Sequence, residues 1–264
     1  MVADALDAIE NRLGGIFHYD VRNTNRSIGA RLSGEIARRH GNYGMAHAPI
    51  TLRLRGTAGQ SLGVWNAAGL NLLLEGDAND YVGKGMAGGK IVIHSPAGST
   101  LNTRETAIIG NTCLYGATGG KLFAAGLAGE RFAVRNSGCH AVVEGLGDHG
   151  CEYMTGGVVV SLGPTGINFG AGMTGGLAYV FDPENRFPEC YNPEFIDLHR
   201  IGTEDMAAAL ALLRQLIREF VEETGSPWGR ELLDNFAERR NQFWLVKPQA
   251  QQIDRVLETI RQPR

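Results

Sequence analysis

The chain has 264 residues, of which 43% are hydrophobic and 20% are charged, and its formal net charge is −3. This composition is typical of a folded globular protein, and a slightly acidic chain without runs of like charge argues against a nucleic acid or a membrane surface as partner. No apolar stretch is long enough to span a bilayer and no secretory signal is visible at the N-terminus, so we expect a cytoplasmic location.

The first predicted element is a short helix near the N-terminus. Ser33 is a suitable N-cap and Gly41 a suitable stop, so the sequence predicts a helix from Ser33 to His40. We assign residues 1–48 to an N-terminal lead-in that caps the domain that follows.

A glycine-rich repeat of about 19 residues comes next, and 30 of the 37 glycines lie between Gly41 and Gly176. Because glycine within regular structure costs roughly 0.5–1 kcal/mol relative to alanine, we expect these glycines to supply backbone conformations that other residues rarely adopt. Six glycines close successive repeats as structural turn residues: Gly69, Gly89, Gly120, Gly138, Gly157 and Gly176. Their steps are 20, 31, 18, 19 and 19 residues, so the long step holds an insertion within Ser95–Ile109.

Each closing glycine precedes a short apolar run, such as Ile91-Val92-Ile93, that is typical of a β-strand. Nineteen residues are too few for a strand and a crossover helix, which need about 30, but they fit one coil of a parallel β-helix. Equivalent side chains of stacked coils then form ladders, such as Ile91, Val159 and Ala178. With the strand Ile50–Leu54 included, the pattern predicts an all-β core, a parallel β-helix of about six to seven coils over residues 49–181.

The last part of the chain, residues 182–264, is predicted to be an irregular segment followed by helices that pack on the β-helix. Apolar residues at steps of three and four predict a helix that ends at Gly225. Ser226-Pro227 opens a second helix, for which we predict Phe243 on the apolar face, and a third helix is expected after Pro248.

Several motifs resemble chemical sites but favour structural roles. Residues 83–88 and 170–175 match G-x-G-x-x-G, yet a dinucleotide site needs a following helix and here a strand follows. Four carboxylates could converge on one face, as in carbohydrate-acting β-helix enzymes, although solvated turns are favoured: Asp77, Asp80, Asp148 and Glu152. The seven histidines show no metal-ligand spacing. We therefore predict no catalytic, cofactor or metal site.

The remaining candidates are polar or reactive residues within apolar coils. Cys113 and Cys151 occupy nearly equivalent repeat positions and are expected to be buried, reduced thiols. Four polar residues are expected either to satisfy turn backbone within ladders or to contact a partner: Asn111, Arg135, Asn136 and Glu152.

The motifs of three coils are similar to those of one known family. Residues 76–89, 108–120 and 150–157 look like the C-terminal GXGXG-repeat domain of the glutamate synthase large (alpha) subunit. The resemblance runs from about Arg22 to about Val256, and it implies that the β-helix is right-handed.

The resemblance also implies a role. In this family a cysteine amidotransferase domain releases ammonia from glutamine, and an FMN-binding barrel with an iron–sulfur cluster converts 2-oxoglutarate to glutamate. The β-helix domain carries no assigned catalytic residue, so we expect a structural domain without a cofactor of its own. Its expected partners are the amidotransferase and FMN-binding domains, in the same longer chain or as separate subunits. The alternatives are a stand-alone scaffold subunit of a split glutamate-synthase-like flavoprotein complex and a carbohydrate-acting enzyme.

Overall fold

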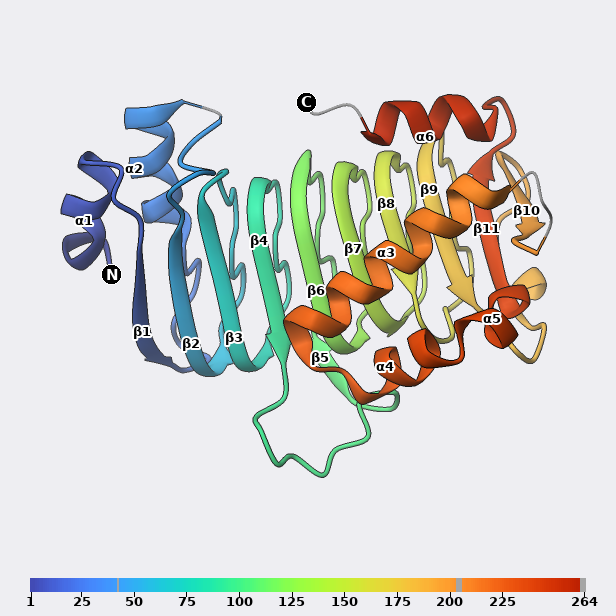
Figure 1. Cartoon of the computed structure of the whole chain (residues 1–264), viewed down its shortest axis with the longest axis horizontal. Helices are drawn as coiled ribbons and strands as arrows, with labels where there is room; N and C mark the ends of the chain where they lie inside the picture. The colour runs from blue at the N-terminus through green and yellow to red at the C-terminus, as the bar shows by residue number, and fades with distance from the viewer. Residues whose placement is uncertain (42, 203–205, 262–264) are drawn as a thin grey trace.

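The computed structural model of the chain describes residues 1–41, 43–202 and 206–261. Its centre is a stack of coils whose strands lie side by side in one parallel sheet (Figure 1), which confirms the predicted parallel β-helix. The strands of this stack are β1 (Gly15–Val21), β2 (Ile50–Ala58), β3 (Leu70–Ala78), β4 (Ala87–His94), β6 (Gly119–Ala128), β7 (Ser137–Leu146), β8 (Thr155–Ser161) and β9 (Gly175–Phe181).

The inner face of the sheet forms side-chain ladders because parallel strands pair in register. The predicted ladder of Ile91, Val159 and Ala178 is present, since Ile91 pairs with Leu122, Leu122 with Ala141, Ala141 with Val159, and Val159 with Ala178. All five side chains are buried in the interior of the coils. The core is therefore continuous from coil to coil along the stack.

The outer face of the sheet is apolar as well, and it is covered by the helix α3 (Ala207–Thr224). Phe123 of β6 packs edge-on against Phe220 of α3, with ring centroids 6.3 Å apart. The hydroxyl of Tyr179 on β9 donates to the carbonyl oxygen of Ala209, at 2.9 Å. As predicted, Gly225 ends this helix, with a left-handed conformation.

The helix α4 (Pro227–Asp234) also lies against this face and begins as predicted, with the Ser226 hydroxyl accepting from the N–H of Gly229 at 2.9 Å. That hydroxyl donates to a carboxylate oxygen of Glu144, 2.5 Å away. Glu144 is fully buried, and burial raises the pKa of its carboxyl group. The carboxyl group is therefore held in an apolar interface, with the Ser226 hydroxyl as a donor and with Thr103 and Arg104 as further polar neighbours.

The N-terminal residues form more structure than the sequence indicated. The helix α1 (Val2–Glu10) and the strand β1 precede α2 (Ala30–His40), and β1 adds the first strand to the parallel sheet. The predicted helix starts three residues earlier than expected. Ser33 is not its N-cap but lies inside it, where the buried hydroxyl accepts from the N–H of Ala67 at 3.1 Å. Gly41 ends the helix, as predicted.

The C-terminal end of the sheet is closed by two strands that the sequence analysis did not predict. The strand β11 (Phe243–Pro248) pairs antiparallel with β9, and β10 (Ile196–Arg200) pairs antiparallel with β11. The prediction that Phe243 lies on a helix is wrong, because α4 ends at Asp234 and Phe243 is the first residue of β11. Two short helical segments, α5 (Phe236–Arg239) and η3 (Arg240–Gln242), lie between them, and another short turn, η1 (Phe187–Glu189), precedes β10. The helix expected after Pro248 is present as α6 (Ile253–Arg261).

The predicted insertion leaves the stack as a long loop between β4 and the short strand β5 (Ala107–Ile109), which rejoins the sheet beside β6 (Figure 1). The guanidinium of Arg104 in this loop lies 4.0 Å from the centre of the Trp228 ring on α4. The loop thus rests against the helices that cover the sheet. Among the described residues, no helix has both the length and the apolar character that crossing a membrane requires.

Candidate interaction surface

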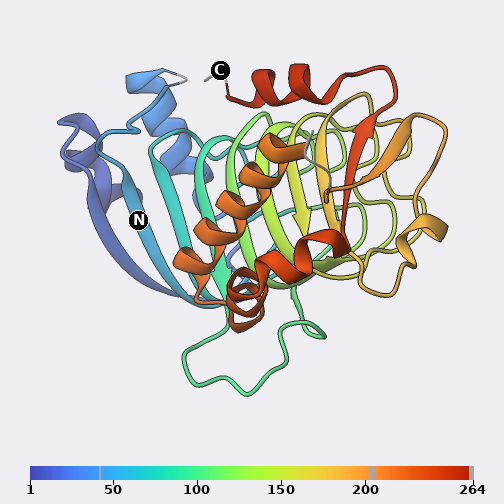
Figure 2. The same ribbon diagram turned by 45° about the vertical axis from the view of Figure 1, so that its right-hand side comes forward.

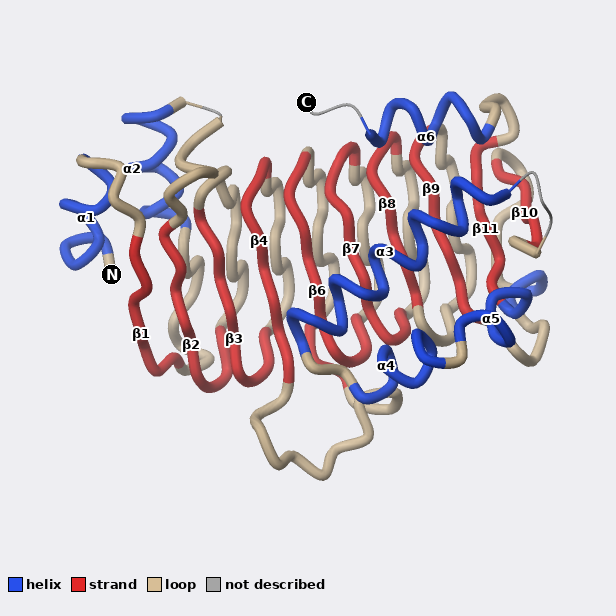
Figure 3. The backbone as a smooth tube through the Cα atoms, in the orientation of Figure 1, coloured by secondary structure: helices blue, strands red, loops and turns tan. Residues whose placement is uncertain are grey.

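The wall of each coil opposite the sheet is built from left-handed residues and lies behind the strands in the view of Figure 3. In six successive coils, three alternate residues have φ between 53° and 73°. We call these eighteen residues the left-handed face: Ser61, Gly63, Trp65; Tyr81, Gly83, Gly85; Thr112, Leu114, Gly116; Arg131, Ala133, Arg135; His149, Cys151, Tyr153; Asn168, Gly170, Gly172.

In each triplet but the last, the backbone N–H groups of the three left-handed residues point in turn to the next coil, to the preceding coil and to the next coil again. In one coil the N–H groups of Arg131 and Arg135 donate to backbone carbonyl oxygens of the next coil, those of Asp148 at 2.8 Å and Glu152 at 2.9 Å. The N–H of Ala133, between them, donates to the backbone carbonyl oxygen of Cys113 in the preceding coil, at 2.9 Å. Each coil is therefore bonded to both neighbours on this wall, as it is on the sheet wall. The alternation explains why the repeat needs left-handed residues at every second position.

Glycine fills only six of these eighteen positions. The other twelve carry side chains, which we did not expect from the glycine pattern, and each costs roughly 1–2 kcal/mol relative to a right-handed conformation. The middle residue of each triplet is buried, while the first and third are exposed or half-buried. The coil-to-coil hydrogen bonds thus hold ordinary residues in a strained conformation, with the middle side chain of each triplet in the core and the other two at the surface.

Two exposed aromatic rings on this face lie over glycines of the next coil. Trp65 is 66% exposed, and a Cβ at Gly85 would lie 2.9 Å from its indole ring. Tyr153 is 56% exposed, and a Cβ at Gly172 would lie 2.6 Å from its phenol ring. Both glycines are therefore required by the close approach of a ring as well as by their positive φ.

Basic side chains accompany the rings. The Lys84 ammonium lies 5.2 Å from the centre of the Tyr81 ring, and the Arg135 guanidinium lies 6.0 Å from that of Tyr153. Within the part of the chain that the structure describes, neither these cations nor Arg131 forms an ion pair with a carboxylate.

The four polar candidates from the sequence all belong to this wall of the coils or to the turns beside it. The Asn111 side-chain oxygen accepts from the N–H of Glu130 in the next coil, at 2.8 Å. A Glu152 carboxylate oxygen faces His149 Nδ1 at 2.8 Å and accepts from the Asn168 amide at 3.0 Å. The Arg135 side chain is exposed, and its guanidinium lies beside the Tyr153 ring.

Asn136 is fully buried, and its amide group satisfies backbone of its own turn. It accepts from the N–H of Cys139 at 2.9 Å and donates to the carbonyl oxygen of that residue at 2.9 Å. The adjacent Gly138 does not have a positive φ, unlike the other five closing glycines, whose φ lies between 70° and 92°. Because Lys121 pairs with His140, Cys139 and not Gly138 lies at the register position of Gly120, and the Asn136 side chain satisfies the backbone of this turn.

The four carboxylates that could have formed a catalytic cluster are bound locally instead. Asp77 accepts from the Thr57 hydroxyl at 2.9 Å, Asp80 from the N–H of Asn111 at 2.8 Å, and Asp148 from the N–H of Ile167 at 2.8 Å. Each bond joins one coil to the next. The structure therefore uses these acidic residues to connect coils, and Glu152 does the same through Asn168.

The buried cysteines have the properties of core residues rather than nucleophiles. Burial raises the pKa of the Cys113 thiol to about 12, and it raises the pKa values of Cys139 and Cys151 as well. Because only a thiolate is a good nucleophile, these thiols are unreactive at neutral pH. Among the described residues, no group of three or more histidine, cysteine or acidic side chains is arranged to hold a metal ion.

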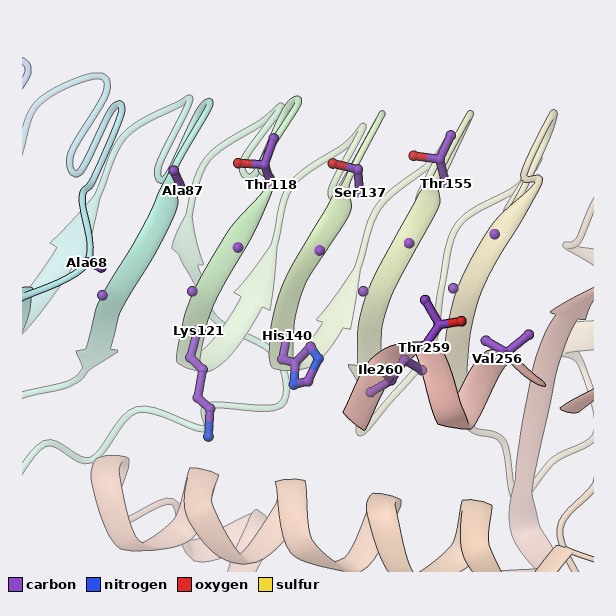
Figure 4. Close-up of a pocket in the computed structure, with 18 of the residues that line it drawn as sticks. Ala68, Ala87, Thr118, Lys121, Ser137, His140, Thr155, Val256, Thr259 and Ile260 are labelled. Atoms are coloured by element: carbon purple, nitrogen blue, oxygen red, sulfur yellow. The ribbon is translucent and has the colours of Figure 1, made fainter. Parts of the chain in front are cut away.

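A groove of about 850 Å³ runs along the edge where the two walls meet (Figure 4). Its floor consists of closing glycines and of a row of short side chains that includes Thr118, Ser137 and Thr155, and α6 forms one side. No acidic residue is present among the described residues that line it. Lys90 and Lys121 also line the groove, and each forms an ion pair with a glutamate of α3, Glu223 and Glu219 respectively.

The sequence matches the protein family described as GXGXG motif over residues 1–249. It is 52% identical over 245 residues to ferredoxin-dependent glutamate synthase 2 of Synechocystis sp., covering 93% of this chain and 16% of that protein. It is 49% identical over 248 residues to the large chain of the NADPH glutamate synthase of Azospirillum brasilense, covering 94% of this chain and 16% of that protein. For the NADH glutamate synthase of Schizosaccharomyces pombe, the identity is 46% over 248 residues, 94% of this chain and 12% of that protein.

Proposed function

The chain belongs to the GXGXG motif family, and from this premise we propose that it is the non-catalytic structural domain of a glutamate synthase. In this role it holds an amidotransferase domain and an FMN-binding synthase domain at a fixed separation. Ammonia released from glutamine then reaches 2-oxoglutarate without escaping to solvent. The overall reaction converts glutamine, 2-oxoglutarate and a reductant to two molecules of glutamate.

The bonding of every coil on both walls is the observation that carries this proposal. Sheet hydrogen bonds join the coils on one side, and the alternating N–H donors of the left-handed face join them on the other. A stack that is bonded on two opposite walls resists both bending and sliding of one coil past the next. Such stiffness suits a spacer between two catalytic domains.

The chemistry of the described side chains supports the same proposal. The carboxylates join coils, and the buried thiols have raised pKa values, so these groups serve the fold. No group of three or more histidine, cysteine or acidic side chains of the described residues is arranged to hold a metal, which supports an iron–sulfur cluster held elsewhere. We propose that FMN and the iron–sulfur cluster belong to the partner domains.

The partner domains are proposed to lie in the same polypeptide or in separate subunits. The chain spans only 12–16% of the relatives named above, which supports an arrangement in which much larger neighbours surround it. A stand-alone scaffold subunit of a split flavoprotein complex is the second arrangement compatible with this role.

The proposal is tested with the purified 264-residue chain. We expect it to bind no FMN, by absorbance at 450 nm after incubation with the cofactor, and to release no ammonia from glutamine. We also expect it to associate with a polypeptide that has FMN-dependent glutamate synthase activity. Flavin bound at stoichiometric occupancy, or glutaminase activity of the chain alone, would overturn the proposal.

A further inference from the structure

We propose that the left-handed face is the surface on which another domain of the same enzyme docks, through an apolar patch that contacts its exposed rings and charged groups that pair with its charged side chains. This inference rests on the proposed function and adds the location and chemistry of the interface.

Coverage distinguishes the two walls of the stack. The outer side of the sheet is covered by α3 and α4, while α6 follows the edge groove and α1 and α2 lie at the N-terminal end (Figure 2). None of these described helices lies over the left-handed face (Figures 1 and 2). Its large exposed side chains, Trp65, Tyr81 and Tyr153, therefore remain in solvent within the described residues.

The exposed residues are of the types that contribute most to protein interfaces. Tryptophan, tyrosine and arginine are enriched among residues whose truncation weakens binding strongly. The rings of Trp65 and Tyr153 are also supported from below by Gly85 and Gly172. Because a ring that is already fixed loses little conformational freedom on binding, this arrangement favours tight association.

The charge of the face defines its partner more closely. Three acidic side chains near it, Asp80, Asp148 and Glu152, are engaged in hydrogen bonds within the chain. Its cations are not engaged with carboxylates among the described residues, as shown above. A hydrogen bond from a neutral N–H or amide leaves a carboxylate charged, and Glu130 is exposed beside Arg131. The face therefore carries charges of both signs around its rings, and it is complementary to an apolar patch that is itself surrounded by charges of both signs.

The size of the relatives favours a neighbouring domain over a second copy of the chain as the occupant. The relatives that match this chain are about six to eight times longer than the matched region, since it covers 16% or 12% of them. A neighbouring domain of the enzyme is therefore the occupant to which we commit.

Oxidative footprinting tests the inference. The 264-residue chain and the complete glutamate synthase that contains it are exposed to hydroxyl radicals, and the labelling rate of each aromatic residue is measured by mass spectrometry. We expect Trp65 and Tyr153 to be labelled at least about tenfold more slowly in the complete enzyme. Trp228, which is 6% exposed, provides the rate of a buried ring in both samples.

A pair of charge reversals supplies the matched control. In the complete enzyme, Arg135→Glu is expected to restore the labelling of Trp65 to within about twofold of its rate in the isolated chain. Arg53→Glu makes the same change at an exposed position of β2 on the opposite wall and is expected to leave Trp65 protected. Both variants of the isolated chain should unfold at the wild-type temperature, which shows that folding is intact.

The labelling pattern distinguishes a wrong docking surface from a wrong structural role. Equal labelling of Trp65 in the two samples, with protection confined to the edge groove or α6, overturns the inference and leaves the structural role standing. Identical labelling of every residue in the two samples shows that no domain docks on the chain and overturns both. Protection of Trp65 that persists in the Arg135→Glu variant contradicts the part assigned to charge.

Discussion

The sheet wall and the left-handed wall are produced by one repeat, yet they meet different requirements. On the sheet wall the outward apolar side chains from β4 to β9, such as Phe123 and Tyr179, are buried by the chain's own helices. On the left-handed wall the backbone is constrained at every second residue, and the outward side chains remain exposed. Both walls thus have their backbone hydrogen bonds between coils, but one wall is covered by the chain's own helices and the other is exposed.

The energetic contributions of the two walls follow from this difference. Each large side chain buried between the sheet and α3 contributes about 1.5–3 kcal/mol to stability. An outward side chain of the left-handed face buries little, and its backbone conformation is unfavourable. The sheet wall therefore stabilises the chain, while the other wall is free to be shaped by a partner.

Truncation of Phe123 is expected to have the largest effect on stability. Phe123→Ala leaves a cavity between β6 and Phe220 of α3, and we expect the free energy of unfolding to fall by about 3–5 kcal/mol. Chemical denaturation followed by far-UV circular dichroism measures the loss. Phe195→Ala, at a phenylalanine that is 45% exposed, is the control and should cost less than about 1 kcal/mol. Equal losses would contradict the importance of the covered wall.

A pair of glycines separates conformational strain from steric crowding. At Gly116 a Cβ has open space around it, so Gly116→Ala should cost only the left-handed strain, about 1–2 kcal/mol. At Gly176 a Cβ would lie 2.7 Å from a backbone oxygen of Gly157, and overpacking of about 1–3 kcal/mol is expected in addition. The difference in unfolding free energy between the two variants measures the crowding between coils, and no difference would mean that the coils can separate without cost.

The sequence was sufficient to predict the sheet wall because its signals are local. A closing glycine followed by an apolar run predicts one strand, and the regular spacing of these glycines predicts that the next strand lies beside it. The ladder through Ile91 and Val159 agrees with this prediction. The cap at Ser226 and the stop at Gly225 were predictable for the same reason, since they depend on neighbouring residues alone.

The left-handed wall could not be predicted from residue types. Leu114 and Tyr153 have no intrinsic preference for positive φ, and they adopt it because two neighbouring coils accept or donate hydrogen bonds there. The strands β1 and β11 were missed because they lie outside the glycine rhythm. Phe243 was placed on a helix because its true neighbour, Phe181 of β9, is far away in the sequence.

The buried carboxyl group of Glu144 provides a test of the covered wall through pH. Its pKa in the folded chain is above the ordinary value of 4.5, because burial disfavours the charge. The protonated form is therefore favoured by folding, so its contribution to stability is complete below about pH 4.5 and is lost as the pH rises through the folded pKa. We expect Glu144→Gln, which is neutral at every pH, to be more stable than the wild type at pH 8.

Melting temperatures of both proteins between pH 4 and pH 8 measure this difference. The gap between variant and wild type should widen with pH. Glu75→Gln removes a half-buried carboxylate on β3 of the same sheet and is the matched control for the substitution itself. A constant gap at Glu144 would mean that its carboxylate is better solvated than its burial between the sheet and α4 indicates.

Truncation of Trp65 is expected to have the smallest effect on the isolated chain, and this makes it the sharpest test of the comparison. Its ring is 66% exposed, so Trp65→Ala removes little buried area, and the left-handed backbone is equally unfavourable for both residues. We expect a change of less than about 1 kcal/mol in the free energy of unfolding, measured as for Phe123→Ala. A loss comparable to that of Phe123→Ala would show that the ring stabilises the coil stack itself, and the exposed wall would then be structural rather than available to a partner.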